Sequence, residues 1–165
     1  ATGESPTNGS NVLSSVGSGT QLARFKVTNN GSAQITLTDA TFTNSGSHTG
    51  TDERYTVYAS SENSNDYTAN TLEASSTDTV AFGSLTTPVT INGGSYRYIT
   101  VAITTVGSTA SGDTYSLSIA SLGDLKYSVT ESALGYDANQ DNDQGDTVTS
   151  LRVDGKPALG TIQKQ

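Results

Sequence analysis

The sequence predicts an all-β fold, an antiparallel β-sandwich of the immunoglobulin-like or jelly-roll type with very little helix. Roughly eight to eleven short runs alternate apolar and polar residues at the two-residue period of a strand that buries one face. Turns rich in Gly, Asn and Ser separate these runs, as is typical of sandwiches. No segment keeps an apolar period of three to four residues over three turns, so we expect helix to be scarce.

The chain is long enough to form one domain whose core is stable without disulfides. At 165 residues it can bury roughly two thirds of the surface that its unfolded form exposes. We expect a single sandwich domain over residues 21–165, preceded by a polar N-terminal arm over residues 1–20. The sequence has no Cys, which rules out disulfides and thiolate metal sites. Ala1 stands in place of an initiator Met, which predicts a processed, mature form.

The charge balance excludes one class of partner. Asp and Glu number 16 against 8 Lys and Arg, which gives a formal net charge of -8 at pH 7. Such a surface repels phosphates over most of its area, so we expect no nucleic-acid partner. No run approaches the ~20 apolar residues of a membrane span. The abundance of Ser, Thr, Gly and Asn suits a secreted protein at the cell surface.

The strand pattern begins at Gln21. Residues 21–28 alternate Ala, Phe and Val with Arg and Lys, which predicts a strand with one buried face. The Asn-Asn-Gly-Ser turn at 29–32 follows, because Asn and Gly tolerate positive φ. The next strand changes phase at Asp39, as a β-bulge would make it do. The polar excursion at 60–78 and the Gly/Ser loop around His48 are expected to be surface loops without a catalytic role. Further strands are expected at 55–59, 80–82, 88–91, 96–106, 115–119, 125–129 and 148–153.

The N-terminal arm has only three sizeable apolar residues, Val12, Leu13 and Val16. An arm this polar buries too little apolar surface to order itself. A strand at 11–17 would instead gain ladder hydrogen bonds by adding to a sheet, with Val12 and Val16 in a hydrophobic groove. We therefore predict that Val12, Leu13 and Val16 form a subunit interface, as a strand donated to a neighbouring copy. The alternative is that the arm is the first strand of its own sandwich.

An acidic loop near the C-terminal end is the strongest candidate for a ligand site. Carboxylate or amide oxygens stand at Asp137, Asn139, Asp141, Asp143 and Asp146, and no base lies among them. Uncompensated carboxylates repel one another, and oxygen ligands at alternate positions suit a hard cation. We therefore predict calcium as the cofactor of this loop. The alternative is a solvated acidic hairpin loop, because Asn, Asp and Gly are common turn residues.

This loop resembles the calcium loops of EF-hands and thrombospondin type 3 repeats, which share Asp-x-Asp/Asn-x-Asp followed by a glycine and a later acid. The resemblance implies that the alternating oxygens of 137–146 bind one ion. Two positions depart from the pattern. Asn142 stands where the turn glycine is usual, and Val148 stands where an EF-hand has its bidentate Glu, with Asp146 the nearest substitute. No helices are expected on either side, so we do not expect an EF-hand domain.

The sequence offers few residues from which a catalytic site could be built. His48 is the single histidine and there is no Cys, so a Ser-His-Asp triad would rest on one residue in a Gly/Ser loop. The glutamates Glu53, Glu62, Glu73 and Glu131 are scattered, and we expect them to be solvated surface acids rather than a glycosidase pair. The sequence has no Trp and shows no compact aromatic platform on which a sugar could stack. We expect no enzymatic activity.

Two segments, LARFKVTNNG at 22–31 and GGSYRYITV at 93–101, carry a general likeness to known surface proteins. They resemble the paired strands of bacterial and archaeal extracellular sandwiches, including TasA/camelysin-type biofilm fibre subunits and archaeal bundling pilins. The resemblance implies polymerisation by donor-strand complementation, in which each subunit's terminal strand completes the sheet of its neighbour. We therefore expect a structural subunit of an extracellular filament, pilus or surface layer that polymerises with itself. The alternative is a calcium-stabilised adhesion module that binds carbohydrate or a cell-surface partner.

Overall fold

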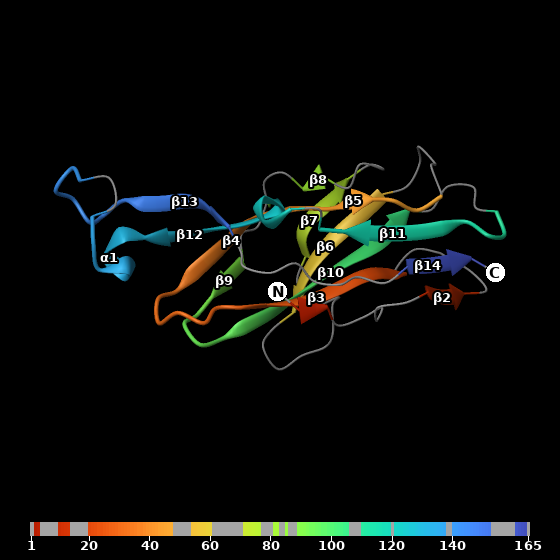
Figure 1. The fold of residues 1–165 in the computed structure, drawn as a ribbon, viewed down its shortest axis with the longest axis horizontal. Helices are drawn as coiled ribbons and strands as arrows, with labels where there is room; N and C mark the ends of the chain where they lie inside the picture. The colour runs from red at the N-terminus through yellow and green to blue at the C-terminus, as the bar shows by residue number, and fades with distance from the viewer. Residues whose placement is uncertain are drawn as a thin grey trace.

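The predicted fold class is confirmed. The computed structural model describes residues 2–3, 10–13, 20–47, 54–60, 71–76, 81–82, 85, 89–105, 110–119, 121–137, 140–152 and 161–164. Within these residues the chain is a β-sandwich whose strands are almost all antiparallel, with one short α-helix and one 3₁₀ turn (Figure 1). No helix in this described part is long and apolar enough to cross a membrane.

The first layer is a five-stranded antiparallel sheet. Its order is β1 (Thr2–Gly3), β3 (Gln21–Thr28), β10 (Tyr96–Thr105), β6 (Arg54–Ser60) and β7 (Thr71–Ser76). The long central strand β10 pairs with β3 on one side and with β6 on the other. Because β10 lies between two partners, both of its backbone edges are hydrogen-bonded, which fits the long apolar run that the sequence shows there.

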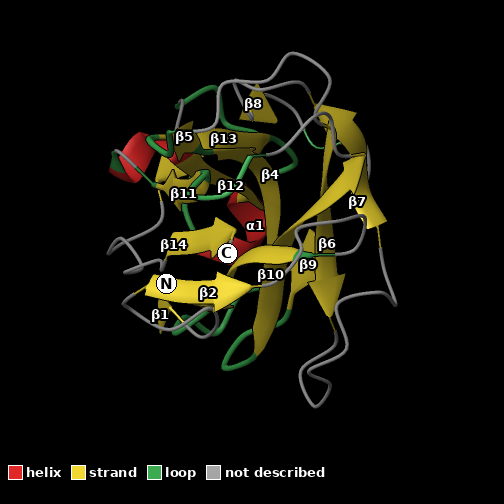
Figure 2. Ribbon diagram, turned by 90° about the vertical axis from the view of Figure 1, so that its right-hand side faces the viewer, coloured by secondary structure: helices red, strands yellow, loops and turns green. Residues whose placement is uncertain are grey.

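The second layer consists of two smaller sheets that share one stretch of chain (Figure 2). The first has the order β13 (Thr147–Arg152), β12 (Leu125–Thr130), β4 (Ile35–Thr41) and β8 (Ala81–Phe82), and β9 (Val89–Ile91) also pairs with β4. The second has the order β2 (Ser10–Leu13), β14 (Thr161–Lys164), β11 (Thr114–Ser118) and β5 (Thr43–Asn44). Only Phe42 separates β4 from β5, so one stretch of chain contributes a strand to each sheet.

The core lies between the two layers. Phe42, at the junction of β4 and β5, is buried and its ring centroid is 6.0 Å from that of Phe25 on β3. Aromatic pairs at this separation add to the free energy gained from burying their apolar area. The largest fully buried side chains come from both layers, namely Leu22, Phe25, Tyr55, Ile99 and Ile103 from the first and Leu37, Phe42, Ile91, Tyr115, Leu117 and Leu125 from the second.

The predicted phase change in the second strand is confirmed as a bulge. Lys126 of β12 pairs with Asp39, whereas Tyr127 pairs with Leu37. Thr38 is therefore an extra residue on β4. The bulge keeps Leu37 buried on one side of it and returns the following apolar residues to the core on the other.

The turn at 29–32 exists, but the reason given for it from the sequence is wrong. Asn29 and Gly31 are absent from the described residues that have positive φ. The buried Asn29 side chain shapes the turn instead, because its Nδ2 donates to the carbonyls of Ala33 at 2.6 Å and Ile91 at 3.1 Å. Its Oδ1 accepts a hydrogen bond from the Gly31 N–H at 3.0 Å. The turn between β9 and β10 does use a positive φ, since Gly94 has a φ of 72°.

The predicted excursion at 60–78 is not simply a loop. Its residues Thr71–Ser76 form β7, which pairs with β6 at the edge of the first sheet, and Ser60 is buried. The sequence TLEASS lacks a clean apolar alternation. An edge strand of this kind is held by its backbone ladder to one neighbour, which leaves little trace in the hydrophobic pattern.

Candidate functional site

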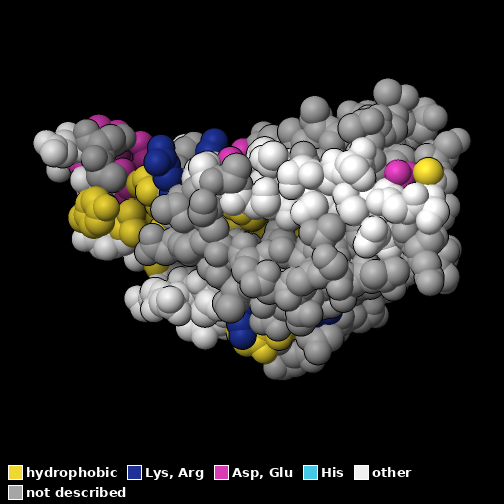
Figure 3. Space-filling model, turned by 45° about the vertical axis from the view of Figure 1, so that its right-hand side comes forward, with side chains coloured by type: hydrophobic (Ala, Val, Ile, Leu, Met, Phe, Trp, Pro, Cys, Tyr) yellow, Lys and Arg dark blue, Asp and Glu magenta, His cyan; other side chains and the backbone are white. Residues whose placement is uncertain are grey.

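The hairpin formed by β12 and β13 extends to one end of the molecule (Figure 1). The four-residue helix α1 (Glu131–Leu134) follows β12 and ends at Gly135, which is left-handed with a φ of 77°. The backbone N–H of Glu131 donates to the Asp146 carbonyl at 2.9 Å and closes the connection. Figure 3 shows acidic side chains gathered at this end of the molecule. We call residues 136–146 the acidic tip.

Asp137 organises the first half of the acidic tip. One carboxylate oxygen accepts a hydrogen bond from the Gln140 N–H at 2.5 Å, and the other accepts one from the Asn142 N–H at 2.7 Å. Gln140 and Asn142 both have left-handed backbones, with φ of 63° and 69°. Asn142 therefore adopts the conformation for which a calcium loop uses its turn glycine, and Asn is one of the few other residues that tolerates it.

The later carboxylates of the acidic tip are exposed, and two of them accept hydrogen bonds from backbone N–H groups of the same loop. Asp141 accepts a hydrogen bond from the Asp143 N–H at 2.9 Å, and Asp143 accepts one from the Gly145 N–H at 2.8 Å. Among the described residues, no three acidic side chains are placed to hold a metal ion together. The predicted ligands Asp137, Asp141, Asp143 and Asp146 therefore share one loop without converging, and Asn139 lies outside the described residues. The donor chemistry suits calcium, and calcium binding stays a prediction.

A groove of about 460 Å³ lies between the 29–33 turn and the hairpin that bears the acidic tip. Its apolar lining comes from Val27, Ile35, Tyr127, Val129 and Leu134, of which the two valines are buried and the others are half-buried. The amide and hydroxyl groups of the turn and the Arg152 side chain complete the lining. The groove is therefore lined by both apolar and polar groups.

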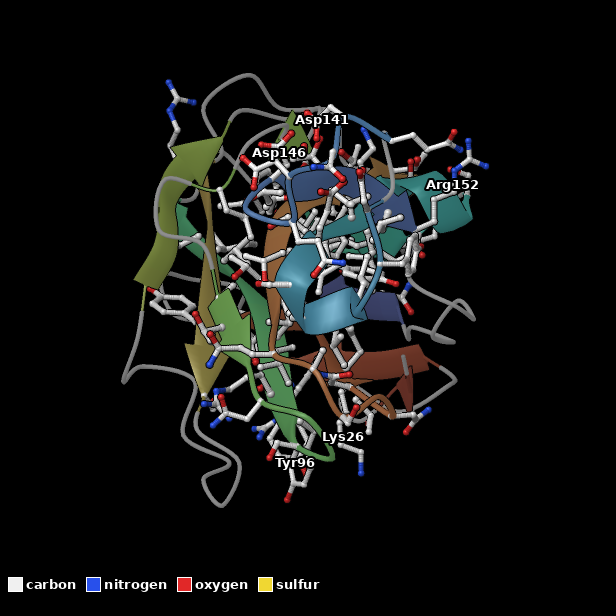
Figure 4. The ribbon with its side chains drawn as sticks, turned by 90° about the vertical axis from the view of Figure 1, so that its left-hand side faces the viewer. Lys26, Tyr96, Asp141, Asp146 and Arg152 are labelled. Carbon is white, nitrogen blue, oxygen red and sulfur yellow. The ribbon has the colours of Figure 1, made fainter. Side chains whose placement is uncertain are left out.

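A row of aromatic and basic side chains crosses β3 and β10. Tyr98 pairs with Lys26 in register, and the Arg24 guanidinium carbon lies 4.3 Å from the Tyr98 ring centroid. The Lys26 Nζ lies 4.9 Å from the Tyr96 ring centroid. The two tyrosine rings meet edge to face, with centroids 5.5 Å apart. We call Arg24, Lys26, Tyr96 and Tyr98 the tyrosine–cation row, and Figure 4 shows its Lys26 and Tyr96 side by side.

The sequence contains a pattern that indicates this row, although the strand prediction did not use it. Tyr96 and Tyr98 occupy one phase of β10, and Arg24 and Lys26 occupy one phase of β3. The strand prediction treated the two basic residues as the solvated face of β3, but Arg24 is only 7 % exposed. The correction follows from the pairing of β3 with β10, because each cation then lies over a tyrosine ring and loses water in exchange for a cation–π contact.

The N-terminal arm contributes β2, which carries the predicted interface residues Val12 and Leu13. This strand pairs in parallel with β14 of the same chain, with Val12 opposite Gln163 and Leu13 opposite Lys164. Among the described strands β2 lies at the edge of this sheet, and β14 pairs on its other side with β11. Within one chain the arm thus adds to its own sheet, as in the alternative that the sequence left open. Val16 lies outside the described residues, and donation to a neighbour stays a prediction.

One predicted surface acid is buried. Glu131 is only 1 % exposed, so its interpretation as a solvated residue is wrong. It is the first residue of α1, and the chain reverses around it to bring Asp146 onto its backbone N–H. Glu73 lies in β7, whereas His48, Glu53 and Glu62 lie outside the described residues.

The comparisons with known proteins add no relative. No protein-family model matches the chain, and no curated protein or solved structure matches it either. The described residues form a β-sandwich with a short strand at a sheet edge, an acidic tip and a tyrosine–cation row.

Proposed function

We propose that the chain is a structural subunit of an extracellular filament or surface layer, a homopolymer joined by donated strands. In this proposal β2 of one subunit leaves its own sheet and pairs with β14 of the next. The single observation that carries the proposal is the placement of β2. It is a four-residue strand, it lies at the edge of its sheet among the described strands, and its described ladder runs to β14 alone.

The energetics of β2 favour exchange. Parallel pairing is slightly less stable per residue than antiparallel pairing, and a short strand with few pairing partners opens at low free energy. A neighbouring copy offers the same β14 edge in the same register, so the hydrogen bonds lost in one chain form again between two chains. Exchange therefore costs little enthalpy and converts a contact within one chain into a link between subunits.

Composition supports an extracellular location for this polymer. The chain is rich in Ser, Thr, Gly and Asn and has no Cys to be oxidised outside the cell. A net charge of -8 keeps unassembled subunits apart at low ionic strength. A calcium-stabilised adhesion module is the second candidate, and the groove of about 460 Å³ favours it.

Removing residues 1–18 should abolish polymerisation, because the truncated chain keeps the β14 edge but has no β2 to donate. Removing residues 1–9 is the matched control, since that chain loses β1 and keeps all of β2. Sedimentation and negative-stain microscopy of both truncations beside the full chain make the comparison. Polymers from the 1–18 truncation that equal those of the full chain would contradict strand donation. Monodisperse particles from the full chain would favour the adhesion module.

Calcium should raise the melting temperature through the acidic tip. Extracellular calcium modules bind with dissociation constants of about 10⁻⁴ to 10⁻³ M, so 10 mM calcium would stabilise the fold by about 1.4–2.7 kcal/mol. For a chain of this size, that corresponds to a shift of about 3–10 °C over the value in chelator. The double variant Asp141→Asn with Asp143→Asn should lose the shift while its amide oxygens still accept the loop hydrogen bonds. Equal melting temperatures for the unmodified protein in calcium and in chelator would rule calcium out.

A further inference from the structure

Two surfaces of this chain carry charge of opposite sign. On β3, Arg24 and Lys26 alternate with the buried Phe25 and Val27, so both cations lie on the face of the sheet that is turned away from the core. The neighbouring strands β3, β6 and β10 contain no Asp or Glu. The acidic tip has the opposite composition, with Asp137, Asp141, Asp143 and Asp146 and no base. Opposite charges on two such surfaces attract the sheet of one molecule to the tip of another.

The tyrosine–cation row is suited to an anionic occupant. Lys26, Tyr96 and Tyr98 are half-buried, so each keeps part of its surface in solvent. Neither tyrosine hydroxyl makes a hydrogen bond to the described part of the chain, and each hydroxyl can donate to an incoming carboxylate. The two rings are inclined at 79°, and a cation lies over each of them. This arrangement is not the flat platform on which a sugar chain stacks, and it places the half-buried Lys26 beside two phenol groups.

The acidic tip has the properties of a docking element. Asp141, Asp143 and Asp146 are exposed, and Tyr136 beside them is the large apolar side chain that stands out in solvent, 57 % exposed, among the described residues. The hydrogen bonds from the loop's own N–H groups hold Asp137, Asp141 and Asp143 in place before any partner arrives. Because the carboxylates are already ordered, docking loses less conformational entropy than it would with a loose loop.

The two surfaces lie on opposite sides of the molecule. Figure 4 shows Lys26 and Tyr96 at one side of the sandwich and Asp141 and Asp146 at the other. One chain therefore cannot bring its own acidic tip onto its own tyrosine–cation row. A contact between two different patches is heterologous, and such a contact repeated from copy to copy produces an open chain of subunits.

We propose that the acidic tip of one copy docks on the tyrosine–cation row of the next copy, head to tail. This inference rests on the proposed function as a self-assembling subunit and names the surface that guides the assembly. Lys26 meets the tip carboxylates, and Tyr96 and Tyr98 donate hydrogen bonds to them. A calcium ion bound in the tip would cancel two of its four negative charges, so the tip stays anionic with the ion in place. The contact steers subunits together and is screened by salt, since the Debye length falls from about 10 Å at 0.1 M to about 3 Å at 1 M.

Zero-length carbodiimide coupling tests the contact directly, because it joins a carboxylate to an amine only when the two touch. A mixture of nitrogen-15-labelled and unlabelled full-length protein is coupled at about 20 mM and at about 1 M salt, digested and analysed by mass spectrometry. We expect peptides that join Lys26 to the 137–146 segment, in mixed-isotope pairs, with at least tenfold less at the higher salt. Lys126, which is half-buried on β12, is the internal control and should not give this link.

Charge reversal supplies the second readout. Lys26→Glu should slow assembly at low salt at least tenfold and remove its salt dependence, whereas Lys126→Glu should leave both unchanged. If the protein polymerises and the Lys26 link is absent, the docking contact is overturned and strand donation stands. If the link forms between copies and no polymer appears, the contact stands and the filament function is overturned. Binding of a polyuronate at Lys26 without any link between copies would assign the row to a glycan and overturn the contact.

Discussion

Replacing Asn29 with Asp should lower the free energy of unfolding by about 3–5 kcal/mol. Asn29 is only 6 % exposed, and its amide donates to the carbonyls of Ala33 and Ile91. A carboxylate has no proton to donate to either carbonyl and would place negative charge against both. The Asn29 backbone N–H and carbonyl also bond to Ser95 and Gly94, so a displaced side chain would loosen three segments together.

The neighbouring residue supplies the matched control. Asn30→Asp makes the same chemical change one position later, where the side chain is exposed. We expect it to change the free energy of unfolding by less than about 0.5 kcal/mol, as exposed substitutions usually do. Denaturant titrations of both variants measure the two free energies of unfolding, which are compared if their dependence on denaturant concentration is the same. A loss for Asn29→Asp no larger than that for Asn30→Asp would show that the Asn29 amide does not organise this end of the sandwich.

Much of the fold could be predicted because burial leaves a two-residue period in the sequence. Phe25, Leu37 and Leu117 lie on strands whose alternation the sequence shows, and all are buried in the structure. The change of phase at Asp39 could be predicted for the same reason, since a bulge is the usual way to return apolar side chains to the core. Local patterns therefore sufficed wherever one face of a strand packs against the other layer.

Contacts between segments distant in the sequence could not be predicted in this way. Asn29 and Asn30 look alike in the sequence, yet Asn29 is buried and donates to the Ile91 carbonyl, 62 residues away, whereas Asn30 is exposed. The tyrosine–cation row needs the pairing of β3 with β10, whose register the alternation of either strand alone does not give. Strand β7 escaped prediction because TLEASS shows no clean apolar alternation, which pairing of its backbone with β6 does not require.

The acidic tip was predicted in part. The sequence predicted that its carboxylates share one loop, and the glycine-like backbone of Asn142 agrees with the calcium-loop pattern. It could not predict that Asp137, Asp141 and Asp143 would each bind backbone N–H groups of their own loop. The competition between these short-range bonds and a shared cation depends on the path of the loop, which residue types alone do not fix.

A disulfide that joins β2 to β14 within one chain should prevent polymerisation completely. The chain has no Cys, so a pair introduced by Val12→Cys and Gln163→Cys would be the only one. These positions face each other across the parallel ladder. Adjacent strands lie about 4.8 Å apart, within the Cα separation of about 4.4–6.8 Å that a disulfide spans. Oxidised before assembly, this variant should stay monomeric, because β2 cannot leave its own chain, and reduction should restore polymerisation.

The same variant provides the measurement that tests strand donation most directly. The reduced protein is assembled, oxidised in the assembled state and separated on a denaturing, non-reducing gel, with Val12→Cys alone as the control that can form no product larger than a dimer. Strand donation predicts a ladder of covalent dimers, trimers and longer multimers, because position 12 of each copy then lies beside position 163 of its neighbour. Assemblies that dissolve into monomers carrying an internal disulfide would contradict it.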